Sequence, residues 1–255
     1  MHYYKIDNMD TIENLSLACD TETGVCSPNE NINRETELLH HTGKKAKPKL
    51  MYYYDALCGW CYGFSPVMSK LQAEYNDILD VEVISGGLFL GNNAGFVNDV
   101  APHIKLGAYK AVESKTGVKF GKSFLADVFG KGEMTLNSLP PSIALCIVRE
   151  QFPEKELKFA ALLLSAVYFD GINPINVEEY KKCIVTIGFD FEDFSQKMKD
   201  DTYKEMAENE FQLFRNSQYS GMPALVLEKN GQQTLLSNGY VGYTELKSRI
   251  DPFLK

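Results

Sequence analysis

Two cysteines separated by two residues, Cys58-Gly-Trp-Cys61, are the side chains whose type and spacing could most directly perform chemistry. The thiolate of one cysteine can attack a disulfide, and the second cysteine can then resolve the mixed disulfide that forms. The motif follows an apolar run at 50–54 and precedes a helix-like stretch at 62–75. Free N–H groups and the positive dipole end at a helix N-terminus stabilise a thiolate. We therefore expect Cys58 to be the exposed nucleophile and Cys61 to be the more buried resolving thiol.

A Cys-x-x-Cys motif can also supply half of a zinc site, so metal binding is the alternative to redox chemistry. A zinc site needs a second pair of ligands, and the chain offers no second Cys-x-x-Cys and no matching histidine-rich segment. We therefore favour a redox-active dithiol and expect no metal.

A second pair of cysteines, Cys19 and Cys26, lies in a polar N-terminal segment that ends in a lysine-rich stretch at 44–49. The spacing of this pair is too long for a standard zinc knuckle. Three interpretations stay open. The two thiols are incidental or structural, or they form an accessory dithiol that exchanges with the first pair, or they bind a metal together with His40 or His41.

The composition of the chain bounds its class and its partners. Its 255 residues are 44% hydrophobic and 12% aromatic, which is typical of a globular protein. A net charge of −8 disfavours partners that are nucleic acids or anionic membranes. We see no secretory leader and no apolar run long enough to span a bilayer, so we expect a cytoplasmic location. In a reducing compartment, a close cysteine pair is more often catalytic than structural.

The elements that must position the dithiol follow from hydrophobic periodicity, which predicts an α/β fold. Strands expected at 50–54 and 80–84 enclose a helix, and such a unit implies parallel strands with a right-handed crossover. A long helical block follows, in which Ser138 is expected to cap the second of the helices at 103–116, 138–151, 154–170, 176–187 and 201–218. The chain is expected to close with an Asn-Gly hairpin turn and a last helix, through strands at 224–228 and 234–237 and the helix at 243–254.

Three motifs in this order resemble those of the DsbA family of thiol-disulfide oxidoreductases. They are the Cys-x-x-Cys after the first strand, Ser220-Gly-Met-Pro223 before the third strand, and the stretch 239–246, whose first glycine precedes the last helix. The string from Asp55 to Tyr62 is more similar to the FrnE-like and 2-hydroxychromene-2-carboxylate isomerase-like branch than to periplasmic DsbA. The resemblance extends from about residue 50 to residue 254.

The resemblance implies a thioredoxin fold that carries an inserted all-helical domain. Residues 50–93 and 219–255 would form the thioredoxin-fold domain, and residues 94–218 would form the helical insertion. Residues 1–49 lie outside the resemblance and would form a partly flexible N-terminal extension.

The resemblance also implies which residues surround the dithiol. Pro223 would be cis and would leave the backbone of Met222 free to bind an extended substrate. Trp60 would present an exposed apolar surface to the substrate. Where the thioredoxin and DsbA proteins carry an acidic residue six positions before the first cysteine, this chain has Tyr52. Asp55 is therefore the candidate for proton transfer to the resolving thiol.

The leading interpretation is a thiol-disulfide oxidoreductase or isomerase that acts on protein or small-molecule disulfides and thiols, with a separate reductant or oxidant partner. No cofactor is expected, and glutathione is a candidate co-substrate. One alternative is a glutathione-dependent isomerase or transferase of the 2-hydroxychromene-2-carboxylate isomerase or kappa type, with Asn137 and Ser138 lining a small-molecule pocket. The other alternative is a non-enzymatic chaperone or partner-binding module, for which Cys58→Ser would keep full function. The presence of both cysteines favours dithiol exchange.

Overall fold

A computed structural model describes residues 17–19, 26–28, 47–219 and 221–254 of the chain. The chain divides into two units, Met1–Ala46 and Lys47–Lys255. In the first unit, the short strands β1 (Leu17–Cys19) and β2 (Cys26–Pro28) pair in antiparallel register, which places Cys19 opposite Cys26.

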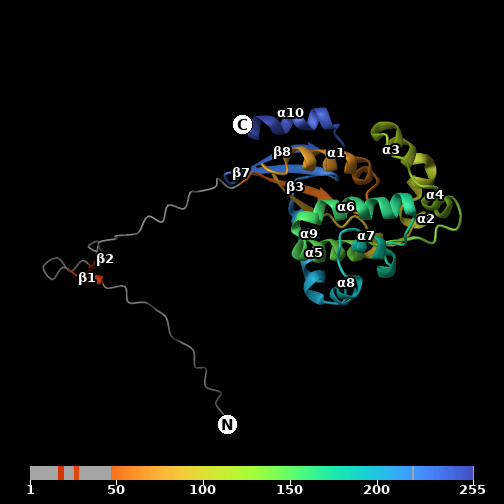
Figure 1. The fold of residues 1–255 in the computed structure, drawn as a ribbon, viewed down its shortest axis with the longest axis horizontal. Coiled ribbons are helices and arrows are strands. Elements are labelled where there is room, and N and C mark those ends of the chain that lie inside the picture. The colour runs from red at the N-terminus through yellow and green to blue at the C-terminus, as the bar shows by residue number, and fades with distance from the viewer. Residues whose placement is uncertain (1–16, 20–25, 29–46, 220, 255) are drawn as a thin grey trace, which may run out of the picture. The chain divides into compact units, whose positions relative to one another are not determined.

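The second unit is built on a four-stranded mixed sheet with the strand order β4-β3-β7-β8 (Figure 1). Strands β3 (Lys49–Tyr54) and β4 (Asp80–Ser85) are parallel, and helix α1 (Gly59–Tyr75) makes the crossover between them. Strand β7 (Ala224–Lys229) runs antiparallel to β3, although the two strands are far apart in the sequence. These pairings confirm the predicted βαβ unit and join it to the end of the chain.

The central position of β3 explains its continuous apolar run, because both of its faces are buried. Leu50, Tyr52 and Tyr54 belong to the main core, which α1 covers. Met51 and Tyr53 point to the opposite face, where Phe214 packs against them. Phe214 lies on helix α9 (Asp201–Asn216), so the sheet has one helical layer on each face.

A long helical segment connects β4 to β7, as predicted (Figure 1). Its helices before α9 are α2 (Val97–Val100), α3 (Tyr109–Thr116), α4 (Lys122–Phe129), α5 (Leu139–Gln151), α6 (Glu156–Ser165), α7 (Lys181–Thr186) and α8 (Phe191–Lys197). Shorter 3-10 and π turns connect them at η1 (Gly91–Asn93), η2 (Ile104–Ala108), η3 (Pro153–Lys155), η4 (Ala166–Asp170) and η5 (Val177–Tyr180). A two-stranded ladder of β5 (Gly95–Phe96) and β6 (Thr135–Leu136) completes it. The sequence patterns missed α4 and α8.

Three of the predicted helices are interrupted, and one of them, 176–187, begins as the 3-10 turn η5 before it continues as α7. The stretch 103–116 breaks at Gly107, whose φ of 107° is incompatible with a continuous right-handed helix. The stretch 154–170 changes from a 3-10 turn through α6 to a π turn, and it ends at Gly171 in the left-handed conformation. The predicted helix end at residue 170 is therefore confirmed, whereas the prediction of uninterrupted helices is wrong.

The end of the chain follows its local signals closely. Asn230 and Gly231 both have positive φ, as a two-residue hairpin turn requires, and they join β7 to β8 (Gln232–Asn238). Helix α10 (Tyr243–Leu254) then packs against α1 on the same side of the sheet (Figure 1).

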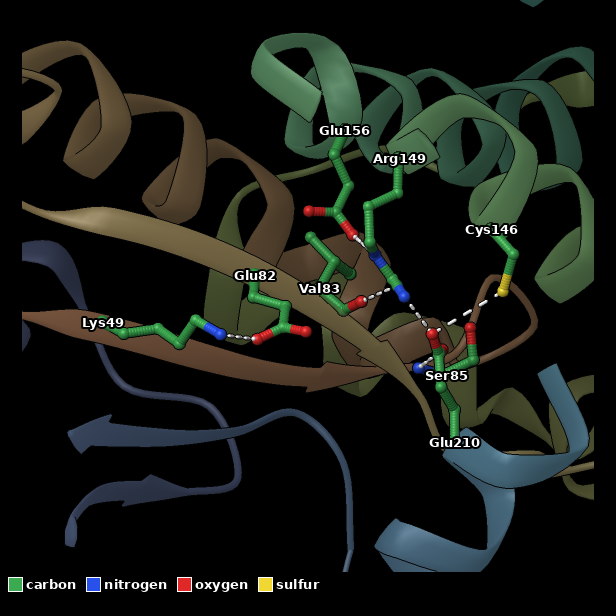
Figure 2. A network of polar contacts seen from close by, with 8 residues as sticks. All are labelled: Lys49, Glu82, Val83, Ser85, Cys146, Arg149, Glu156 and Glu210. Atoms are coloured by element: carbon green, nitrogen blue, oxygen red, sulfur yellow. Dashed lines mark hydrogen bonds and ion pairs between the residues drawn. The ribbon is translucent and has the colours of Figure 1, made fainter. Parts of the chain in front are cut away.

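A buried ionic network connects the helical segment to strand β4 through hydrogen bonds (Figure 2). The Arg149 guanidinium of α5 donates hydrogen bonds to Glu156 of α6, to Glu210 of α9 and to the carbonyl oxygen of Val83. The second oxygen of Glu210 accepts the backbone N–H of Ser85 at 2.7 Å. Each charged group in this network therefore has a partner, as burial of a charge requires.

The sheet order and the helical segment between β4 and β7 confirm the predicted α/β thioredoxin fold with inserted helices. The boundaries at residues 93 and 219 stay a prediction, because residues 47–255 form one compact unit. No helix in the part of the chain that the structure describes has both the length and the apolar character that a bilayer crossing requires.

Candidate active site

Cys58 occupies the N-cap position of helix α1. Its extended backbone conformation stops the helix there, and its sulfur accepts the backbone N–H of Cys61 at 3.4 Å. The free N–H groups of the first turn and the helix dipole both favour negative charge at this sulfur. The predicted placement of Cys58 at a helix N-terminus is therefore confirmed.

Cys58 is not exposed as predicted, because only 7% of its surface is accessible. The backbone carbonyl of Met222 lies over the sulfur and accepts the thiol hydrogen at 3.6 Å. The Met222–Pro223 peptide bond is cis, as the resemblance implied. This contact joins residues 164 positions apart, so local spacing could not reveal that the thiol would be covered.

Gly86 leaves the space that the Met222 side chain fills. A Cβ atom at Gly86 would lie 2.2 Å from the Met222 sulfur, far inside van der Waals contact. The glycine therefore permits the close approach of the 86–89 loop to the segment before β7.

Cys61 is fully buried, one turn inside α1. Burial raises the pKa of the Cys61 thiol well above its ordinary value, and the neighbouring Cys58 raises the pKa further. The two sulfurs thus differ strongly in environment, with Cys58 at the helix terminus and Cys61 in the core. The roles of nucleophile and resolving thiol stay a prediction.

Asp55 is buried between the active-site turn and the 86–89 loop. One carboxylate oxygen accepts the backbone N–H of Leu57 and the other accepts that of Leu88, both at 2.8 Å. Burial raises the pKa of Asp55, and these N–H donors oppose that increase. Asp55 therefore holds the two loops together, while its role in proton transfer stays a prediction.

A cavity of about 630 Å³ opens beside Cys58 and Trp60. Aromatic side chains from separate segments line it, namely Phe89, Tyr109, Phe120 and Tyr168. Polar side chains also line it, namely Asn92, Asn93, Asp99 and His103. A volume of this size suits a small organic ligand. The sequence patterns did not predict the lining of this cavity, because the lining residues come from segments that only the fold brings together.

Asn137 and Ser138 do not line this cavity, so that expectation is wrong. The buried Ser138 hydroxyl oxygen accepts the backbone N–H of Phe89 at 2.9 Å instead of capping α5. Asn137 supplies an oxygen to the first N–H of that helix, at Leu139. Both side chains therefore have structural roles.

Trp60 is 38% exposed, as predicted for the residue between the cysteines. Other large apolar side chains are also exposed near the cavity wall or on the segment that follows β4. They are Leu88, Phe96 and Leu106, and Leu106 is 87% exposed. These residues provide apolar surface to which a substrate or partner could bind.

The chain has four further cysteines. Cys146 and Cys183 are buried in the core, where burial raises the pKa of each thiol. Cys19 and Cys26 are paired in the register of the β1–β2 ladder of the first unit. Within the described residues, no group of three or more His, Cys, Asp or Glu side chains is arranged to hold a metal ion.

Comparison with known proteins relates this geometry to a family. The model of the DSBA-like thioredoxin domain matches residues 49–251. A solved structure from Nitrosomonas europaea, described as a candidate protein disulfide isomerase, is 27% identical with a TM-score of 0.72 and covers 82% of this chain and 98% of that chain. The cytosolic disulfide reductase DsbM from Pseudomonas aeruginosa is 22% identical with a TM-score of 0.65, covering 81% and 98%, and was also solved with GSH.

The curated relatives that the chain matches are named as ClpXP adapter proteins and not as disulfide isomerases or reductases. The ClpXP adapter protein SpxH from Halalkalibacterium halodurans is 24% identical over 189 residues, which cover 71% of this chain and 56% of that protein. The chain therefore spans about half the length of the curated relatives it matches.

Proposed function

The chain belongs to the family of DSBA-like thioredoxin domains, and from this premise we propose that it is a thiol-disulfide oxidoreductase acting through Cys58 and Cys61. The observation that carries the proposal is the asymmetry of the two sulfurs. Cys58 caps α1 where anions are stabilised, and Cys61 is held in the core one turn away. A nucleophile and a resolving thiol need this difference.

The reaction balances as two successive exchanges. The Cys58 thiolate attacks one sulfur of a substrate disulfide, and the other substrate sulfur leaves as a thiolate that takes up a proton. Cys61, as a thiolate, then attacks the Cys58 sulfur and releases the second substrate thiol. The substrate gains two electrons and two protons, and the protein is left with a Cys58–Cys61 disulfide. A separate dithiol returns the protein to its reduced form, and every step also runs in reverse.

Two features of the site support the choice of peptides and small thiols as its substrates. The Met222 carbonyl lies at the nucleophilic sulfur, where it could accept an N–H from an extended peptide. The cavity beside Cys58 could hold a small thiol, and we propose glutathione as a co-substrate there. The relative solved with GSH supports this choice. A reducing, cytoplasmic location is part of the same proposal, in line with the cytosolic DsbM.

The test is titration of the protein with mixtures of reduced and oxidised glutathione, with Trp60 fluorescence as the reporter. A reversible two-electron couple that is lost in Cys58→Ser and in Cys61→Ser supports the proposal. A midpoint of about −270 mV would indicate a reductase, and a midpoint of about −120 to −180 mV would indicate an oxidase or isomerase. The absence of any reversible couple in the unmodified protein would refute the proposal.

A second candidate function is suggested by the adapter proteins among the curated relatives. The exposed apolar side chains Trp60, Leu88 and Leu106 could bind a partner protein without thiol chemistry. This alternative predicts that Cys58→Ser retains function, whereas Leu106→Glu loses it. The two substitutions therefore separate a binding role from an enzymatic one.

We also propose that Cys19 and Cys26 form an accessory dithiol. They are directly opposite in an antiparallel ladder, where Cα distances fall in the range that a disulfide bridges. Oxidised glutathione, as a disulfide oxidant, would take the two electrons and two protons. Mass spectrometry after thiol alkylation should find a Cys19–Cys26 link at glutathione potentials. Two free thiols under fully oxidising conditions would rule this out.

A further inference from the structure

One buried polar atom near the dithiol has no use in the mechanism above, namely the hydroxyl of Tyr52. Tyr52 lies on β3 with 1% of its surface exposed, and its hydroxyl oxygen has no hydrogen-bond partner among the described residues. A buried hydroxyl without a hydrogen-bond partner destabilises the folded protein. A phenylalanine would fill the same space without that cost, so the hydroxyl calls for an explanation.

The packing of Tyr52 places its ring beneath the first turns of α1. Its ring centroid lies 5.8 Å from that of Phe64, in an edge-on contact. Phe64 follows Cys61 by three residues and therefore lies on the same face of the helix. Cys61 and Tyr52 are both in the main core, on the α1 side of the sheet.

Both active-site sulfurs affect the pKa of the Tyr52 hydroxyl. Burial raises the pKa of Tyr52 most, and the next contributions are from Cys61 and then Cys58. A phenol hydrogen that faces a thiol gains little while the thiol is neutral. It gains a charge-assisted hydrogen bond when that sulfur becomes a thiolate.

We propose that Tyr52 is a catalytic residue that donates a hydrogen bond to the Cys61 thiolate. The inference rests on the proposed function and deepens it. In the resolving step, the bond stabilises the thiolate that attacks Cys58. In the reverse step, it stabilises Cys61 as the leaving group when an external thiolate attacks Cys58. The tyrosine keeps its proton throughout, so the electron and proton balance of the exchange is unchanged.

The chain offers a matched control in Tyr54, two residues along the same strand. Its hydroxyl is equally buried and also lacks a hydrogen-bond partner among the described residues. After burial, Asp55 raises the pKa of Tyr54 most and Cys61 comes next, whereas for Tyr52 the contribution of Cys61 comes directly after burial. Tyr52→Phe and Tyr54→Phe each remove one buried hydroxyl oxygen, so they differ chiefly in which group that hydroxyl faces.

The experiment uses rapid mixing of the reduced full-length protein with the chromogenic disulfide dithiobis(nitrobenzoate). Attack by Cys58 releases one coloured thiolate, and resolution by Cys61 releases the second, so the two steps are separate phases. We expect Tyr52→Phe to leave the first phase within about twofold and to slow the second by roughly 10- to 100-fold, the size of a hydrogen bond to a charged group. The pH midpoint of the second phase should also rise.

The outcomes separate this inference from the function on which it rests. A second phase in Tyr52→Phe that matches the unmodified protein, or slowing of the same size in Tyr54→Phe, would overturn the role of Tyr52. Equal slowing of both phases would indicate a general packing defect, which also contradicts the inference. If the unmodified protein shows no second phase, Cys61 does not resolve mixed disulfides and the proposed function itself fails.

Discussion

Replacing Glu156 with glutamine is expected to remove a large pH dependence from the stability of this protein. Glu156 is buried in the network with Arg149 and Glu210 (Figure 2). Burial raises the pKa of the Glu156 carboxyl from 4.5 to about 7, and the nearby Glu210 adds to that increase. Arg149 opposes it without cancelling it. Near neutral pH, folding therefore buries the charged Glu156 carboxylate, which lowers the free energy of unfolding.

The magnitude follows from linkage between proton binding and folding. A pKa raised from 4.5 to about 7 corresponds to about 3 kcal/mol of stability, at 1.36 kcal/mol per pKa unit. The folded protein holds this proton where the unfolded chain has lost it. The contribution is therefore fully present below pH 4.5, and it is lost as the pH rises through about 7. Between pH 5 and pH 8 the loss is roughly 2.5 kcal/mol.

The assay is urea unfolding of the unmodified protein and of Glu156→Gln at several values between pH 5 and pH 8. The unmodified protein should lose roughly 2.5 kcal/mol across that range, equivalent to about 5–10 °C in Tm. Glutamine is neutral and nearly isosteric, so the variant should lose much less and should be the more stable protein at pH 8. Glu154→Gln is the control, because the Glu154 side chain is 67% exposed.

A steep pH dependence that persists in Glu156→Gln would refute this reasoning, because the titrating group would then lie elsewhere. A variant that is less stable than the unmodified protein at pH 8 would also refute it. That result would mean that the ion pair with Arg149 outweighs the cost of burying the charge.

Three further predictions concern residues around the dithiol. Asp55→Asn replaces one of two accepting oxygens with an amide donor, so one of the N–H groups of Leu57 and Leu88 loses its partner. We expect a loss of about 2–3 kcal/mol in urea unfolding; full stability with slow resolution at Cys61 would instead indicate proton transfer. Gly86→Ala would force the Met222 side chain to move, and we expect a loss of about 1–3 kcal/mol together with altered thiol exchange. Gly59→Ala meets its nearest atom at 3.6 Å, so it should raise thermal stability by up to about 1 kcal/mol; a loss equal to that of Gly86→Ala would contradict both assignments.

Local patterns were sufficient to predict the elements that carry the dithiol. The apolar run at 50–54, the turn at Asn230-Gly231 and the helix at 243–254 all occur where they were expected. Their signals are local, because alternation, turn residues and helical periodicity depend on residues only a few positions apart. The two active-site cysteines are assigned for the same reason, since their spacing and the helix start lie within four residues.

Patterns that depend on distant contacts were misjudged. Ser138 has the residue type of a helix cap, but it bonds to the 86–89 loop. The stretch 103–116 has helical periodicity, but Gly107 breaks it. In both cases the preference of a local segment was overridden by its packing or by a single backbone angle.

The surroundings of the sulfurs are a property of the folded protein alone. The carbonyl that covers Cys58 comes from Met222, and the Asp55 carboxylate beneath the turn accepts the backbone N–H of Leu88. These groups meet because β3 pairs with β4 and β7, and sequence spacing carries no record of which distant strands pair. The chain pattern therefore predicts which atoms react, whereas tertiary packing decides how accessible, how charged and how well supported each sulfur is.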